Sequence, residues 1–216
     1  MKGLKCYLAY TPTLFKLIVL VLLPVLVLGI ECLNVLTDKV ALFTLISSGV
    51  VFYECLADVW NMGGLHSKDY IGIRMVQSSK RGLEFSKKVV LYDCLRKYVY
   101  MAVFAVANLL VLYFSIGREA VGTYAQTVWY VYWTSTATLM LFTLICRFIC
   151  NITGVFVLTY MASIVASTLF ALIVACNGHQ TLWMVAMVVA PIVSIVMGCL
   201  LVLVGCKKME GSYYDS

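Results

Sequence analysis

The sequence contains few charged residues. Only 12% of its 216 residues are Asp, Glu, Lys or Arg, whereas 63% are hydrophobic, and the mean hydropathy is +0.98. Soluble domains carry about a quarter charged residues, so this chain has too little polar surface to cover a water-soluble globule. Most of its surface is therefore predicted to face lipid.

Motifs for catalysis and for cofactor binding are also absent. The chain has two histidines, His66 and His179, and its nine cysteines form no CxxC pair, which leaves no set of ligands for a histidine-based metal or haem site. It contains no P-loop, Rossmann glycine pattern, nucleophile elbow or HExxH. It also has no basic stripe interleaved with aromatics of the kind that binds nucleic acid. We therefore expect no enzyme, no cofactor, no metal and no nucleic-acid partner.

What the chain does contain is a series of long apolar stretches. Each can cross a bilayer as a helix, since a crossing needs about 20 residues and a helix pairs its own backbone polar groups. The runs are continuous rather than alternating, which argues against strands. The sequence predicts an all-α membrane protein, a polytopic bundle of six transmembrane helices arranged as three hairpins in one domain. The predicted spans are 14–33, 40–59, 98–116, 127–149, 154–176 and 182–206.

The distribution of basic residues predicts the orientation. If the N-terminus is cytoplasmic, only Lys39 and Arg118 of the 16 Lys and Arg residues fall on outer loops. Basic residues accumulate on cytoplasmic loops, so both termini are predicted to lie inside. The cytoplasmic parts are then a basic loop, 60–97, whose second half can extend the third span as a helix, and a tail, 207–216. Cleavage of the first span as a signal peptide is an alternative that would leave five spans.

Ionisable residues inside predicted spans are the first candidates for a functional site. Glu54 and Asp58 lie four residues apart on one helical face, and intramembrane carboxylates often line ion paths. We favour a structural role in which Glu54 pairs with Arg147, at a similar predicted depth. Asn108, near the centre of the third span, is expected to form an interhelical hydrogen bond. The alternative is that these four residues line an ion or substrate path.

The basic loop is the second candidate site. Its Lys and Arg side chains suit contact with anionic lipid headgroups or with a protein partner. The residues concerned are Lys80, Arg81, Lys87, Lys88, Arg96 and Lys97.

Two further features concern cross-links and bends. Cys32 and Cys176 are both predicted at the outer face, where a disulfide between them is one reading and free thiols are the other. Pro191 predicts a kink in the last span; a kink can serve a gate, although proline is common in membrane helices. Hydroxyl and small side chains in the fourth and fifth spans suit close helix packing better than a polar cavity.

Taken together, these patterns predict a structural, membrane-organising or partner-binding protein. It would act through helix packing and its basic cytoplasmic loop, as a homo-oligomer or with another membrane protein. The alternative is a small transporter or channel that uses Glu54, Asp58 and Asn108. The sequence does not distinguish the plasma membrane from an endomembrane.

Overall fold

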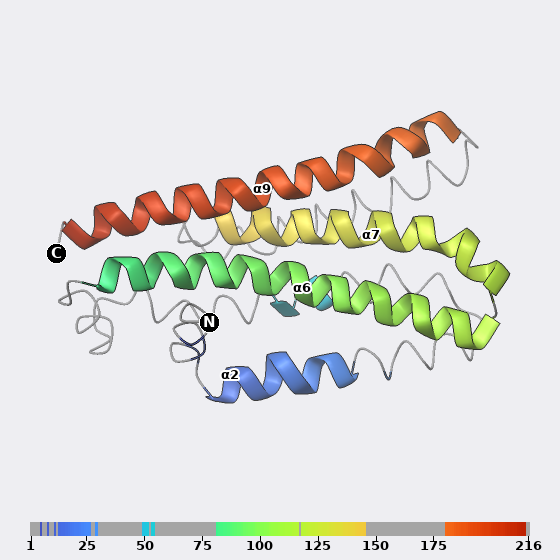
Figure 1. Ribbon diagram of the computed structural model, residues 1–216, viewed down its shortest axis with the longest axis horizontal. Helices are drawn as coiled ribbons and strands as arrows, with labels where there is room; N and C mark the ends of the chain where they lie inside the picture. The colour runs from blue at the N-terminus through green and yellow to red at the C-terminus, as the bar shows by residue number, and fades with distance from the viewer. Residues whose placement is uncertain are drawn as a thin grey trace.

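The computed structural model is helical in nearly all of the chain that it describes (Figure 1). The described residues are 5, 8, 11, 13–26, 29, 49–51, 53–54, 81–116, 118–145 and 180–214. No strand occurs among these residues, so the prediction of an all-α chain is confirmed for them.

Three long helices form the body of the structure. They are α6 (Gly82–Ile116), α7 (Arg118–Leu144) and α9 (Gln180–Tyr214), and each packs against the other two. Helix α6 runs in one direction, and α7 and α9 both run in the other (Figure 1). Near the N-terminus, α2 (Thr13–Leu17) continues directly into a short π-helix, η1 (Ile18–Leu22).

The three long helices extend beyond the predicted apolar spans. Helix α6 begins at Gly82, so the second half of the predicted loop is helical, as expected. Helix α7 begins at Arg118, so the predicted connection at 117–126 is helical from that residue onward. The predicted tail is mostly helical, because α9 continues to Tyr214. Neither of these last two segments contains a proline that would end a helix.

Two of the described helices are long and apolar enough to cross a membrane by length and composition, Gly82–Phe114 and Met184–Gly211. The core helix of a soluble protein can pass the same test. Here, however, only 28% and 22% of the most apolar stretches of these two helices are buried. Membrane association is thus supported, while the six spans and their orientation stay predictions. The predicted spans 40–59 and 154–176 lie largely or wholly outside the described residues.

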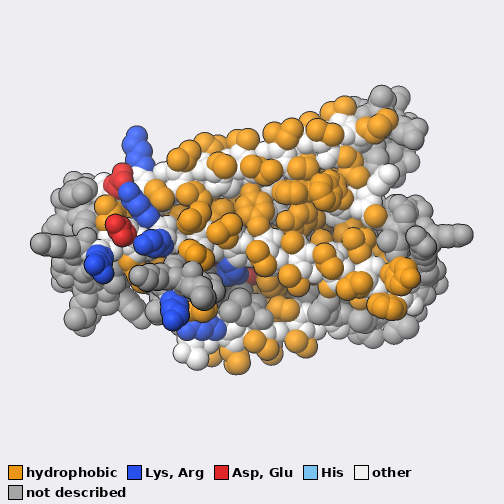
Figure 2. Space-filling view, viewed as in Figure 1, with side chains coloured by type: hydrophobic (Ala, Val, Ile, Leu, Met, Phe, Trp, Pro, Cys, Tyr) orange, Lys and Arg blue, Asp and Glu red, His pale blue; other side chains and the backbone are white. Residues whose placement is uncertain are grey.

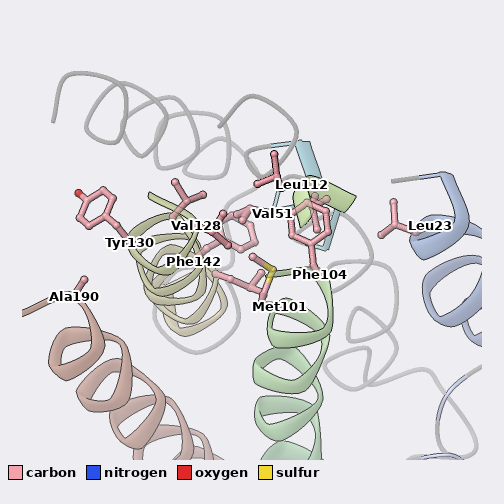
Figure 3. Packing of buried hydrophobic residues seen from close by; sticks show 12 residues of the cluster. Leu23, Val51, Met101, Phe104, Leu112, Val128, Tyr130, Phe142 and Ala190 are labelled. Atoms are coloured by element: carbon pink, nitrogen blue, oxygen red, sulfur yellow. The ribbon is translucent and has the colours of Figure 1, made fainter. Parts of the chain in front are cut away.

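A buried apolar core joins the three long helices to the N-terminal part of the chain. Met101 and Phe104 of α6 pack with Phe142 of α7 and Ala190 of α9 (Figure 3). Leu23, which follows η1, belongs to the same cluster. A second cluster contains Val90, Cys94, Met140, Leu144 and Leu201, again from all three helices. The bundle is therefore held by apolar packing along much of its length.

Large apolar side chains also cover the outside of the bundle. Side chains such as Val103 on α6 and Leu203 on α9 are more than half exposed. Figure 2 shows that hydrophobic side chains cover the long sides of the molecule, whereas most charged side chains gather near the end where α6 begins and α9 ends. An apolar exterior of this extent suits contact with lipid rather than water.

Candidate functional site

The most unusual feature of the interior is a buried ion pair between Glu54 and Arg96. The Glu54 side chain is fully buried and that of Arg96 is 9% exposed. The two side chains form a paired contact, in which Nη1 of Arg96 donates to Oε1 of Glu54 at 3.0 Å and Nη2 donates to Oε2 at 2.8 Å. Paired Arg–carboxylate contacts of this kind fix orientation as well as adding energy. They tie the segment that contains Glu54 to helix α6.

Arg96 also contacts a carboxylate on its own helix, Asp93, which in turn pairs with Lys97. Nε of Arg96 lies 3.4 Å from Oδ1 of Asp93, and Nζ of Lys97 lies 3.0 Å from Oδ2 of the same carboxylate. Asp93, Arg96 and Lys97 share one helical face because residues three and four apart are neighbours on a helix. Asp93 and Lys97 are 1% and 0% exposed, so this face is turned into the protein.

Helix α7 completes the arrangement. Nζ of Lys97 donates a hydrogen bond to Oγ1 of Thr143 at 2.9 Å, and Thr143 donates its own hydroxyl to the carbonyl of Leu139 at 2.8 Å. We call Glu54, Asp93, Arg96, Lys97 and Thr143 the buried charge network. It contains two acidic and two basic side chains, so its formal charge is balanced.

The buried charge network lies within the apolar part of the bundle. Exposed apolar side chains on α6 extend from Leu91 to Phe114, about 35 Å at a rise of ~1.5 Å per residue. This length matches the ~30 Å hydrocarbon core of a bilayer. Arg96 lies about 8 Å inside the end of this strip that starts at Leu91.

Contacts between α6 and α9 place the buried charge network within the apolar part of α9 as well. Tyr98 lies next to Ser194, because its hydroxyl donates to the Ser194 carbonyl at 2.6 Å. The exposed Leu200 and Leu203 follow Ser194 on α9, between the network and the charged end. The outer faces of both helices are therefore apolar at this level.

The charged side chains of this network pair with one another. Burial of an unpaired charge is costly, and removal of one member of a buried pair costs several kcal/mol. Within the described part of the chain, each of the four charged side chains faces at least one of opposite sign. The arrangement therefore suits a fixed connection between helices better than a site that exchanges ions.

The structure revises the predicted interactions of the intramembrane residues. Glu54 is buried and paired, as predicted, but its partner is Arg96; the predicted partner, Arg147, and Asp58 both lie outside the described residues. Asn108 is buried, and its Nδ2 donates to the carbonyl of Phe104 at 3.0 Å. That bond lies within α6, and the expected bond to another helix stays a prediction. An amide can pair with the preceding turn of its own helix when that carbonyl is within reach.

The predicted lipid-contact set divides into two groups. Arg96 and Lys97 are not at the surface, because carboxylates of the interior hold them inward. Lys87 pairs with Glu210 of α9, and Lys88 lies 3.7 Å from Glu84. Both lysines are at the charged end, together with the exposed Arg81. Lys80 lies outside the described residues.

Sequence reasoning missed the roles of Asp93 and Thr143. The signal was present, since Asp93 precedes Arg96 and Lys97 by three and four residues, the spacing that joins side chains on a helix. Because 60–97 is predicted to be cytoplasmic, its charged side chains are expected to face water. Thr143 is one of the hydroxyl residues of the fourth predicted span, for which the sequence favours helix packing.

Several threonine hydroxyls of α7 bond to their own helix. Thr134, Thr136 and Thr138 donate to the carbonyls of Tyr130, Tyr132 and Thr134 at 2.9, 2.6 and 2.9 Å. This agrees with packing rather than with a polar cavity. Glu, Asp, His and Cys side chains form no cluster of three or more metal ligands in the residues that the structure describes.

The cysteines of the described segments are free. Cys94 is buried, Cys199 is exposed and Cys206 is half-buried. Cys32 and Cys176, for which the sequence left a disulfide and free thiols as alternatives, lie outside these segments. Comparison of the chain with protein families, with curated proteins and with solved structures found no match.

Proposed function

We propose that the chain is a multi-pass integral membrane protein with a structural, membrane-organising or partner-binding role. In this proposal it crosses the bilayer six times, with both termini in the cytoplasm, and carries out no catalytic step. The apolar exterior of α6 and α9 supports the membrane location. The pairing of acidic with basic side chains in the buried charge network, among the described residues, carries the structural role.

The buried charge network joins parts of the chain that are distant in sequence. Arg96 connects the segment around Glu54 to α6, and Lys97 connects α6 to Thr143 of α7. Buried polar groups of this kind can select one arrangement of helices over others. We assign the network that task, because a scaffold needs a fixed arrangement of its helices.

The charged end of the bundle supplies the surface for a partner. Lys87 of α6 pairs with Glu210 of α9, so the two helix ends are joined there. Exposed basic residues surround this pair: Arg81, Lys88, Lys207 and Lys208. We propose anionic lipid headgroups as their partner, since a cluster of basic residues beside an apolar surface attracts anionic lipid. A second copy of the chain or another membrane protein would complete the assembly through the apolar faces.

Transport of ions or small solutes is the second candidate. It is favoured by the presence of Glu54, Asp93, Arg96 and Lys97 at a depth where side chains are usually apolar. In this reading Glu54, Asp58 and Asn108 line the path. Transport would require the buried charge network to open during each cycle.

Reconstitution separates the two candidates. The purified protein is placed in liposomes, and proton and potassium flux are measured beside vesicle shape and protein clustering. We expect altered vesicle shape or protein clustering, without flux above that of protein-free vesicles. The same measurements are made on Glu54→Gln and on Glu84→Gln, a matched change in an exposed pair that is 73% exposed at Glu84.

If the protein is a transporter, the opposite result is expected. It requires flux in the wild type that disappears in Glu54→Gln while the helical content and the oligomeric state are unchanged. It also requires Glu84→Gln to keep that flux. This result would overturn the structural role.

A further inference from the structure

Pro191 lies inside helix α9, within the apolar part of that helix, Met184–Gly211, which the proposed function places in the bilayer. Proline has no N–H, so the carbonyl four residues earlier loses its helical donor. In α9 that carbonyl belongs to Met187. An unpaired carbonyl in hydrocarbon is costly, and neighbouring helices often supply the missing partner.

Helix α7 supplies that partner. Nε1 of Trp129 donates to the carbonyl of Met187 at 3.4 Å. An indole N–H is a donor only, and therefore complements a carbonyl that has lost its own donor. Trp129 is 46% exposed, so its ring can also face lipid while its N–H reaches the backbone of α9.

Helix α6 contacts α9 on the C-terminal side of Pro191. The Tyr98 hydroxyl donates to the carbonyl of Ser194 at 2.6 Å. Gly198 makes room for this ring, because a Cβ atom there would lie 3.0 Å from Cε2 of Tyr98. Tyr132 of α7 in turn donates its hydroxyl to the Tyr98 carbonyl at 3.4 Å.

A polar group beside these contacts has no partner. The Ser194 side chain is fully buried, and its Oγ has no hydrogen bond. An unpaired buried hydroxyl raises the free energy of the arrangement that contains it. The free-energy difference between this arrangement and one in which the Ser194 hydroxyl is bonded is therefore smaller than it would be if the hydroxyl were already paired.

We infer that Pro191 is a hinge in α9 that Trp129 and Tyr98 clamp from the neighbouring helices. Trp129 holds the carbonyl that Pro191 frees, and Tyr98 holds the carbonyl on the other side of the proline. Loss of the Trp129 bond releases the first part of α9, from Gln180 to Ala190, to move relative to the rest. This inference rests on the proposed membrane location of α9 and is independent of the proposed scaffold role.

A double-mutant cycle tests the clamp. Trp129→Phe removes the indole donor, and Pro191→Ala restores the backbone donor to Met187. We expect Trp129→Phe to lower the folded-to-unfolded ratio about threefold more in the wild-type background than in Pro191→Ala, from the usual strength of interhelical hydrogen bonds. Unfolding in SDS, followed by circular dichroism, gives the ratios.

Trp133→Phe is the matched control. Trp133 lies one turn from Trp129 on α7, and its Nε1 has no hydrogen-bond partner. Its substitution makes the same change of ring, so its effect should not depend on residue 191. Equal effects of Trp129→Phe with and without Pro191→Ala would overturn the clamp.

Hydrogen exchange tests the hinge without any change at Pro191. We expect Trp129→Phe to speed exchange of the amides of 184–190, while those of 200–206 keep their wild-type rates. Trp133→Phe should leave both groups unchanged. Unchanged exchange in Trp129→Phe, or equal acceleration along all of α9, would contradict the hinge.

Discussion

Glu54 and Arg96 hold each other in the interior through two hydrogen bonds. Glu54→Gln leaves two basic side chains of the network against one carboxylate. We expect a loss of about 3 kcal/mol of stability, the usual cost of breaking a buried pair from one side. Adding Arg96→Gln should recover part of that loss, because the buried charges balance again. SDS unfolding measures both variants.

The exposed pair of Glu84 and Lys88 provides the control for this prediction. Their nitrogen–oxygen distance is 3.7 Å and both side chains are well exposed. Glu84→Gln should therefore change stability by no more than about 0.5 kcal/mol. If Glu54→Gln is equally harmless, or if the double variant is less stable than Glu54→Gln, the buried charge network does not stabilise the bundle.

The candidate site was only partly predictable from the sequence. A carboxylate at Glu54 inside an apolar span requires a buried basic partner, and the structure contains one. The identity of that partner was not predictable, because it depends on how α6 is rotated about its axis. Arg96 and Lys97 looked like surface residues, since long basic side chains usually extend to water. Asp93, one turn earlier, holds them inward instead.

Gly198 gives a prediction about how closely helices α6 and α9 approach. Gly198→Ala should destabilise the protein, because the added methyl group meets the Tyr98 ring. The sign is informative, since Ala in place of Gly normally stabilises a helix by about 0.5–1 kcal/mol. Combining Gly198→Ala with Tyr98→Val should remove the penalty. Thermal or SDS unfolding of the three variants measures it.

Gly211 serves as the control on the same helix. A Cβ atom at Gly211 would meet nothing within 4 Å. Gly211→Ala should therefore be neutral or stabilising. A stabilising Gly198→Ala would show that Tyr98 does not occupy the space beside that glycine.

The outer face of α9 can be tested with cysteines that the chain already has. Cys199 is exposed and Cys94 is buried. Single-cysteine variants that retain one or the other are reconstituted in liposomes. We expect a lipid-soluble maleimide and a charged, water-soluble one both to leave Cys199 unmodified in intact vesicles and to modify it after unfolding in SDS, because lipid covers that face and the reactive thiolate does not form in hydrocarbon.

Cys94 provides the internal comparison. It should react with neither reagent until the protein is unfolded, since α7 and α9 cover it. Rapid reaction of Cys199 with the charged reagent in intact vesicles would place that face of α9 in water. Such a result would argue against the membrane location of α9.

At the scale of the whole molecule, the sequence predicted the class of fold better than its connections. Apolar composition is enough to predict helices, because few other structures satisfy the backbone in lipid. The ends of helices are harder to predict, since a helix can continue through polar residues that no longer face hydrocarbon. Helix α9 does so beyond Lys207 and Lys208, and α7 does so after Arg118.

The charged end leads to a prediction about lipid. Helix α6 starts and α9 ends at this end of the bundle (Figure 1), so the proposed membrane orientation would bring Arg81, Lys88, Lys207 and Lys208 to the same headgroup layer. Replacing all four with Gln should lower the enrichment of phosphatidylserine around the protein in mixed nanodiscs. Each basic residue near an anionic surface contributes about 1 kcal/mol.

Two comparisons separate charge from shape in this experiment. Replacing the three lysines with Arg keeps the charge and should keep the enrichment. Added salt should weaken the enrichment in the wild type, because exposed charges are screened over a Debye length of about 10 Å at 0.1 M. Enrichment that survives the Gln substitutions would exclude these residues as the lipid site. Since the buried charge network is balanced without them, the Gln variant should still fold, and its helical content should match that of the wild type.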